Sequence, residues 1–126
     1  VLREGQKVAL VATGMMVQEA LKAADILSKE GILVTVVDMP CIKPIDEELI
    51  EKIAKSHEII ITCEEHNVYG GLGSAVSEVT SKKSPVRMEM MGMQDTFGES
   101  GTPNELLAKY GLNADHIVEM VKNEYR

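Results

Sequence analysis

The stretch that decides the fold is "TCEEHNVYGGLGSAV", from Thr62 to Val76. A β-branched, apolar run leads into it and ends at Cys63, and an apolar pattern at helical spacing starts at Gly73. Between the two lie three consecutive ionisable side chains and then three glycines within four positions. A buried strand, a glycine-rich turn and a helix, in this order, are typical of the repeating unit of an α/β sheet.

The same alternation of strand and helix continues in both directions from this stretch. Strands that are apolar on both faces, alternating with amphipathic helices, imply a mostly parallel sheet covered by helices on two sides. The sequence thus predicts one α/β domain over residues 1–126, with α/β/α layers and no linker; the strand order stays open. The expected strands are Lys7–Thr13, Ile32–Asp38, Glu58–Cys63 and Val86–Met91. The expected helices are Met15–Lys29, Gly73–Ser81 and three that start near Asp46, Thr102 and Asn113 or Ala114.

Several helix ends carry their usual signals. Gly31 follows the first helix as a C′ glycine would, and Asp46 is placed to cap the second. Thr102, Pro103 and Glu105 form an N-cap hydroxyl, a proline at the first helical position and the acid of a capping box.

Composition narrows the function classes. The chain has 20 acidic and 13 basic residues and a net charge of −7, which disfavours nucleic acid and anionic membranes as partners. No apolar run is long enough to span a bilayer and no signal peptide is visible. Two cysteines, Cys41 and Cys63, are too few for a disulfide framework and are expected to be reduced thiols. The chain begins on Val1, so we expect a fragment of a longer, cytoplasmic protein.

The glycine-rich turn has three interpretations. Gly71-Leu72-Gly73 begins like a dinucleotide fingerprint, but Val76 stands where the third glycine belongs. Six residues, 64–69, are also expected to separate the strand end from the loop, where the fingerprint needs a tight turn. A general anion site at Gly70–Ser74 stays open, because a helix N-terminus presents free N–H groups. A structural or interface turn is favoured over both.

The polar side chains beside the turn could serve either in catalysis or in contacts with another domain or subunit. Glu64, Glu65 and His66 follow a probable parallel strand, where ligands of open α/β sheets bind, and a Glu–His pair there could do acid/base chemistry. No nucleophile stands in a recognisable motif beside them, so polar contacts at a domain or subunit interface are favoured over catalysis.

Two further groups are expected to be structural. Cys41, Cys63 and His66 could hold zinc if they met at strand ends, but no paired ligand spacing supports this, and we predict no metal site. The methionine run is interpreted as strand core and edge rather than as a peptide or metal groove; it comprises Met88, Met90, Met91 and Met93.

Three stretches, in order along the chain, resemble the C-terminal domain of transketolases, in particular of the two-subunit kind in which this domain ends the smaller chain. A fourth is similar to the start of that domain, so the resemblance covers nearly the whole sequence. The three are "VVDMPCIKPID" (Val36–Asp46), "EEHNVYGGLGSAVSEV" (Glu64–Val79) and "DTFGESGTPNELLAKYGL" (Asp95–Leu112), and the fourth is "VALVATGMMVQEALKAADIL" (Val8–Leu27).

Two related families share parts of this pattern. The enzyme 1-deoxyxylulose-5-phosphate synthase is similar through "EEH", the glycine loop and "KPID", but its late motif often has His before the glycine where this chain has Ser100 in "FGESG". The β subunits of 2-oxoacid dehydrogenases share the "KP" turn and a GG loop but lack "FGESG". The resemblance therefore ranks transketolase first and the synthase second.

The resemblance implies a sheet of about five strands and a supporting role. In transketolases, thiamine diphosphate and Mg lie between a pyrophosphate-binding and a pyrimidine-binding domain, while the third domain chiefly supports assembly. The Gly-Asp-Gly motif of the first domain does not occur in these 126 residues. No catalytic, cofactor-binding or metal-binding residue of the family can be carried over. We therefore expect a domain that is inactive alone, binds no cofactor itself, works with those two domains and forms a homo-oligomer.

The resemblance also shifts the interpretation of the opening stretch towards a turn that faces a neighbouring domain. The candidate interface or anion site comprises Glu64, Glu65, His66, Gly70, Gly71, Gly73 and Ser74.

Overall fold

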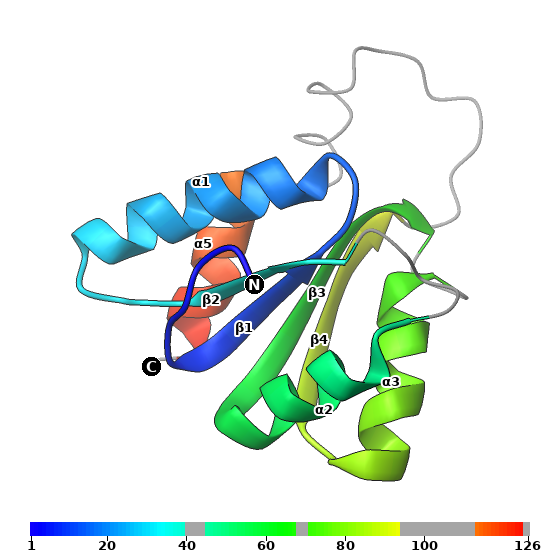
Figure 1. Ribbon diagram of the computed structural model, residues 1–126. Helices are drawn as coiled ribbons and strands as arrows, with labels where there is room; N and C mark the ends of the chain where they lie inside the picture. The colour runs from blue at the N-terminus through cyan, green and yellow to red at the C-terminus, as the bar shows by residue number, and fades with distance from the viewer. Residues whose placement is uncertain (40–44, 68–70, 94–112, 125–126) are drawn as a thin grey trace, which may run out of the picture.

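The structure is a computed structural model that describes residues 1–39, 45–67, 71–93 and 113–124, with the backbone alone for 65–67 and 92–93. Strands and helices alternate along it as the sequence predicts (Figure 1). The expected helix that starts near Thr102 lies outside the described residues. The elements are β1 (Lys7–Ala12), α1 (Met16–Lys29), β2 (Thr35–Asp38), α2 (Glu47–Ser56), β3 (His57–Asn67), α3 (Leu72–Lys83), β4 (Arg87–Met93) and α5 (Ala114–Asn123).

The described strands form one sheet in the order β2-β1-β3-β4, and every neighbouring pair is parallel. The predicted α/β class with a mostly parallel sheet is therefore confirmed. The described part of the chain contributes four strands to the sheet, where the family resemblance implied about five.

Two strand boundaries differ from the expected ones by more than two residues. β2 begins at Thr35 rather than Ile32, because Ile32 still belongs to the end of α1: its N–H donates to the carbonyl of Leu27 at 2.9 Å. β3 runs on to Asn67 rather than stopping at Cys63, because after a register shift Asn67 pairs with Met93 of β4. The prediction that residues 64–69 separate the strand from the turn is therefore wrong, since strand structure covers most of that interval.

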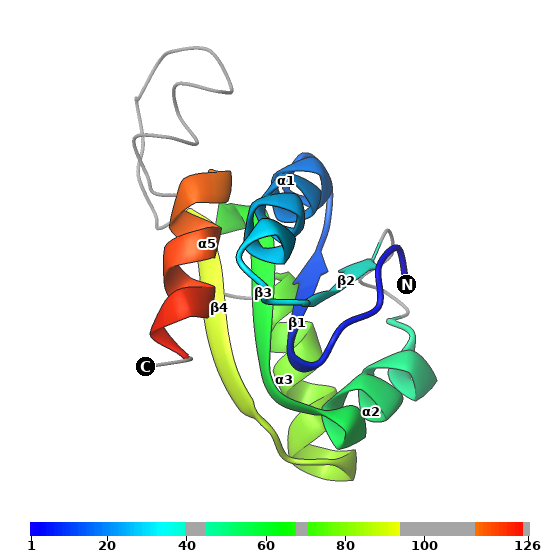
Figure 2. The same cartoon turned by 90° about the vertical axis from the view of Figure 1, so that its left-hand side faces the viewer.

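Helices cover both faces of the sheet (Figure 2). On one face, alternate residues of β1 and β3 pack with α1 and α5, and on the other face the intervening residues pack with α2 and α3. Side chains of successive strand residues point to opposite faces, which is why both sets are apolar. The predicted α/β/α layers are confirmed, and the helix residues expected to point inward include the buried Ala20, Ile50, Val76, Ile117 and Val121.

The predicted helix ends at Gly31 and Asp46 are present. Gly31 has φ +82°, its N–H donates to Ser28, and the Ile32 N–H donates to Leu27, which together make a Schellman motif. Asp46 caps α2, since its carboxylate accepts from the Leu49 N–H at 3.1 Å. Asn113 caps α5 in the same way, through the His116 N–H at 3.2 Å.

The N-terminal residues cover the outer edge of β2. Arg3 forms an antiparallel bridge with Val36, and the Gln6 N–H donates to Leu33 at 2.9 Å. This pairing satisfies backbone groups that an edge strand would otherwise leave open. Gly5 allows the N-terminal segment to pass close to the residues just before β2, because a Cβ at this position would lie 2.4 Å from the carbonyl carbon of Val34.

Candidate functional site

The candidate site lies at the carboxyl edge of the sheet, where β3 leads through the glycine-rich turn into α3 (Figure 1). Ligands of open parallel sheets usually bind outside this edge. The described part of the site is the end of β3, the turn residue Gly71 and the first turn of α3.

Glu64 is turned into the protein rather than outward. Its side chain belongs to the face of β3 that carries α3, and the residue is only 2% exposed. One carboxylate oxygen accepts the Leu72 N–H at 3.1 Å and the other accepts the Gly73 N–H at 2.9 Å. Gly71 is the N-cap residue of α3 and supplies no side-chain cap. A carboxylate on the preceding strand therefore caps this helix.

Gly73 allows the first turn of α3 to lie close against the sheet. A Cβ at this position would lie 2.8 Å from the sulfur of Met90 and 3.1 Å from the hydroxyl of Thr62. The Thr62 hydroxyl is fully buried and has no hydrogen-bond partner within the part of the chain that the structure describes. Close packing thus accounts for this glycine without any ligand.

The other predicted site residues are only partly placed. Glu65 and His66 lie in β3, with side chains that are not described, and Gly70 lies outside the described residues. Ser74 is half-buried in the first turn of α3. The structure therefore brings Glu64, Gly71, Gly73 and Ser74 together, and the interface role of the whole set stays a prediction.

Cys63 precedes Glu64 and is fully buried on the opposite face of the sheet, among residues that pack with α1 and α5. Burial, together with the neighbouring Glu64 charge, raises the pKa of its thiol to about 12. A thiol of this kind is a poor nucleophile and a poor metal ligand.

The zinc alternative would need Cys41, Cys63 and His66 to meet. Cys41 lies outside the described residues and the His66 side chain is not described. Among the side chains that the structure does describe, no three His, Cys, Asp or Glu residues come together as a metal site.

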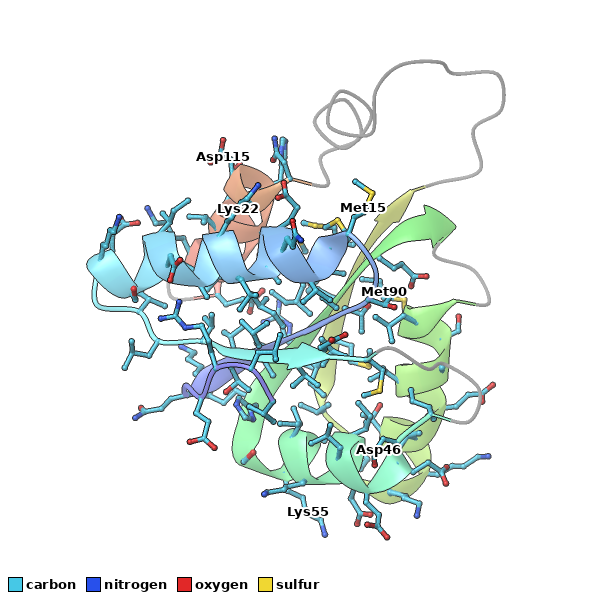
Figure 3. All side chains as sticks on the ribbon, turned by 45° about the horizontal axis from the view of Figure 1, so that its top comes forward. Met15, Lys22, Asp46, Lys55, Met90 and Asp115 are labelled. Carbon is cyan, nitrogen blue, oxygen red and sulfur yellow. The ribbon has the colours of Figure 1, made fainter. Side chains whose placement is uncertain are left out.

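The methionine run is only in part core. Met91 is 7% exposed and Met88 packs against the core under α2 and α3, as predicted. Met90 (Figure 3) is 43% exposed, so it belongs to the edge part of the predicted strand core and edge. It lies on the edge strand next to the first turn of α3, where helix cover begins, and Gly73 contributes no side chain to bury it.

Sequence reasoning missed a polar cluster around His57, which opens β3 at the other edge of the sheet. The His57 Nδ1 lies 2.9 Å from the Ile53 carbonyl, and its Nε2 lies 2.7 Å from the Thr35 hydroxyl. A carbonyl can only accept, so Nδ1 donates in the contact with Ile53, and a neutral ring would then accept from Thr35 at Nε2. The Thr35 hydroxyl in turn accepts the Gly5 N–H at 2.9 Å.

A cavity of about 260 Å³ opens beside this cluster. Its lining includes Glu4, Leu49, Lys52 and His57. The two ring nitrogens of His57 are already bonded within the protein, so the histidine ties α2, β2 and the N-terminal segment together. The contacts join residues 22 and 30 positions apart in sequence, and no local pattern signals them.

In the described residues, hydrogen bonds from Leu72 and Gly73 to Glu64 hold the start of α3 against the end of β3. The buried carboxylate has its acceptors satisfied by two backbone donors, and the buried thiol is held neutral.

No helix in the described part of the chain has the length and apolar character needed to cross a bilayer.

The chain is similar to a known protein family, to curated proteins and to a solved structure. The family model described as "Transketolase, C-terminal domain" matches residues 1–117. The chain belongs to the transketolase C-terminal domain family. The predicted resemblance is thereby confirmed at the level of the family.

Curated relatives of this transketolase-family domain carry two kinds of name. The chain is 40% identical, over its whole length, to a putative transketolase C-terminal section from Methanocaldococcus jannaschii, of which it covers 39%. It is 44% identical, again over its whole length, to a 1-deoxy-D-xylulose-5-phosphate synthase from Desulforudis audaxviator, of which it covers 20%. The chain thus covers less than half the length of each of these two relatives.

A solved structure is also similar to this transketolase-family domain. It is titled "Split gene transketolase, inactive beta4 tetramer" and is 50% identical, with a TM-score of 0.91. The match covers 98% of this chain and 40% of that chain. The fold described above is therefore that of a solved transketolase-type domain.

Proposed function

We propose that this chain is the C-terminal assembly domain of a thiamine-diphosphate-dependent transketolase, which moves a two-carbon ketol unit between sugar phosphates. The observation that carries the proposal is the similarity to the split-gene transketolase, at 50% identity over 98% of the chain. The putative transketolase C-terminal section from Methanocaldococcus jannaschii supports the same assignment. In this proposal the domain acts in the cytoplasm and in the pentose phosphate pathway.

The alternative is the C-terminal domain of 1-deoxyxylulose-5-phosphate synthase. A relative with that name is 44% identical to the chain, so overall identity does not separate the two enzymes. The "FGESG" motif at 97–101, with Ser100 before the glycine, favours transketolase.

The proposed role is structural support for a catalytic centre formed by other domains. Thiamine diphosphate and Mg would be held by the pyrophosphate-binding and pyrimidine-binding domains of the full enzyme. The sequence fits this division, since it has no Gly-Asp-Gly motif. The domain's own contribution would be a rigid surface at the carboxyl edge of the sheet, with the β3–α3 turn facing a neighbouring domain.

Activity measurements test the proposal at two levels. The 126-residue chain, supplied with thiamine diphosphate, Mg²⁺ and sugar phosphates, should give no turnover, and measurable ketol transfer would contradict a purely supporting role. Within the assembled enzyme, ketol transfer between sugar phosphates is the expected activity. Formation of 1-deoxyxylulose 5-phosphate instead would establish the alternative.

An anion-binding regulatory module at Gly70–Ser74 is a second candidate of a different class. The turn does attract a carboxylate, but its Leu72 and Gly73 amides already donate to Glu64. An external anion would have to displace that group or use other donors. Titration with phosphate, nucleotides and sugar phosphates, followed through the amide signals of Gly71, Gly73 and Ser74, tests the idea. If these amide signals do not shift at millimolar ligand, the turn does not bind an external anion.

A further inference from the structure

The amino end of α3 has the properties of an anion site. The first intrahelical bond of α3 runs from the Ala75 N–H to the Gly71 carbonyl, so the Leu72 and Gly73 amides precede any intrahelical acceptor. The aligned peptide dipoles place positive potential at this end of the helix, which favours a negative group. Gly71, at the N-cap, supplies no side chain to meet it.

Glu64 meets this end of the helix as an external carboxylate ligand would. Each of its two oxygens accepts one amide, at 3.1 and 2.9 Å, and the residue is 2% exposed. No Lys or Arg in the described part of the chain forms an ion pair with it. Its charge is therefore balanced by backbone donors and the helix dipole, which is how helix N-termini bind free anions.

A second donor group lies at the same glycine. Thr62 is two residues before Glu64 on β3, so both side chains leave the strand on the α3 face. The Thr62 hydroxyl is 0% exposed, has no hydrogen-bond partner among the described residues, and would lie 3.1 Å from a Cβ at Gly73. A buried hydroxyl without a partner among the described residues thus lies beside Gly73, whose N–H is one of the two donors to Glu64.

We propose that the glycine-rich turn is an anion site whose ligand is the chain's own Glu64 carboxylate. The bond closes the turn by tying the end of β3 to the start of α3. Removal of that carboxylate opens the site to a small carboxylate from solution, such as formate. The proposal stands independently of the proposed function, because it concerns only contacts within this domain.

The test is a rescue experiment on the 126-residue chain. In Glu64→Ala, the melting temperature should fall and the amide signals of Leu72 and Gly73 should move. Sodium formate should then restore both in a saturable manner, while sodium chloride at equal ionic strength should not. Wild-type protein should show neither effect, because its own carboxylate occupies the site. The matched control is Glu78→Ala, which removes an exposed acid from the same helix.

Two results would overturn the proposal. One is a folded Glu64→Ala variant whose Leu72 and Gly73 signals do not respond to formate. The other uses hydrogen exchange and does not depend on that variant folding. Wild-type Leu72 and Gly73 amides should be protected, and in Glu64→Gln, whose side chain keeps one acceptor oxygen, at least one of the two should exchange roughly tenfold faster, as expected for loss of a hydrogen bond to a charged group. Unprotected amides in the wild type would contradict the assignment directly.

Discussion

At the residue scale, neighbouring positions on β3 have opposite environments. Cys63 points into the core shared with α1 and α5, while Glu64 points to the α3 side and is held there by backbone donors. The alternation of a strand separates them, so a buried neutral thiol and a buried carboxylate stand next to each other in sequence.

Cys63 should be chemically inert in the folded chain. In a Cys41→Ser background, which leaves one thiol, alkylation by iodoacetamide at pH 8 should be far slower in native buffer than in urea. The reason is that the thiolate is the reactive form and burial raises the pKa of this thiol to about 12. Equal rates in the two conditions would show that Cys63 is accessible.

The same thiol predicts a stability change at high pH. The folded pKa lies above the ordinary value of 9.0, so the unfolded chain loses its proton first as the pH rises. Stability is then fully present below pH 9.0 and falls as the pH rises from 9.0 towards about 12. The difference in unfolding free energy between wild type and Cys63→Ala should shrink over this range, and urea titrations at pH 8 and pH 10 measure it.

Gly5 is predicted to be intolerant of a side chain. A Cβ there would lie 2.4 Å from the Val34 carbonyl carbon and 2.5 Å from the Leu33 carbonyl oxygen, and backbone atoms cannot swing away. Gly5→Ala should cost about 1–3 kcal/mol of unfolding free energy, as overpacking does. Glu4→Ala, at an exposed neighbour, should change stability little. Similar urea midpoints for both variants would contradict the close approach of Gly5 to the Leu33 and Val34 backbone.

At the element scale, helix starts are secured in two different ways. α2 and α5 use a side chain at the N-cap itself, Asp46 and Asn113. α3 has glycine at its N-cap and is capped by Glu64 from the preceding strand. The first kind of cap is local in sequence, whereas the second forms only when β3 and α3 are packed together.

The α2 cap gives a prediction at this scale. Asp46→Ala should lower the unfolding free energy by about 1 kcal/mol, because the Leu49 N–H loses its acceptor. Asp46→Asn should retain most of the stability, since its side-chain oxygen can accept the same bond. Thermal melts of the two variants measure the difference, and equal losses would indicate that charge rather than capping matters at this position.

At the scale of the whole molecule, the sheet separates two apolar cores. One lies under α1 and α5 and the other under α2 and α3. Several apolar side chains stay outside both cores, among them Val1, Leu2, Leu33 and Met90, each more than two-fifths exposed. Apolar side chains exposed one by one are normal on a protein surface, so by themselves they do not mark an interface.

Self-association is the prediction at this scale. On the proposed assembly role, and on the homo-oligomer that the family resemblance implies, we expect the 126-residue chain to sediment as an oligomer. Sedimentation velocity over a range of protein concentrations measures this. A single monomeric species at all concentrations would contradict the predicted homo-oligomer without affecting the assignment to the family.

Much of the fold could be predicted because its signals are local. Helical spacing placed Val76 and Ile117 in the core, and Gly31 and Asp46 marked helix ends through the conformations and side-chain bonds those positions need. Strand limits were less accurate. Whether Asn67 continues β3 depends on a partner in β4, and that pairing leaves no mark in the neighbouring residues.

The sequence pointed to the β3–α3 turn as a candidate site, and the role of that site stays a prediction; what the structure adds is the hydrogen bonding of Glu64. Glu64 stood out as a polar group at a strand end, but its acceptors bind amides eight and nine residues further on, across the turn. The methionine run was expected to supply strand core and edge, but which of its residues would be exposed, as Met90 is, depends on how α3 packs over the edge strand.

The sequence by itself determined the layered α/β fold, most element positions and the family, since periodicity, caps and motif order are properties of the chain read in one direction. Only the tertiary structure decided that Glu64 is an internal cap and that His57 joins Thr35 and Ile53. The physical reason is that a polar side chain takes its role from the donors and acceptors it meets after packing. Those partners come from distant segments, brought together only when the sheet forms.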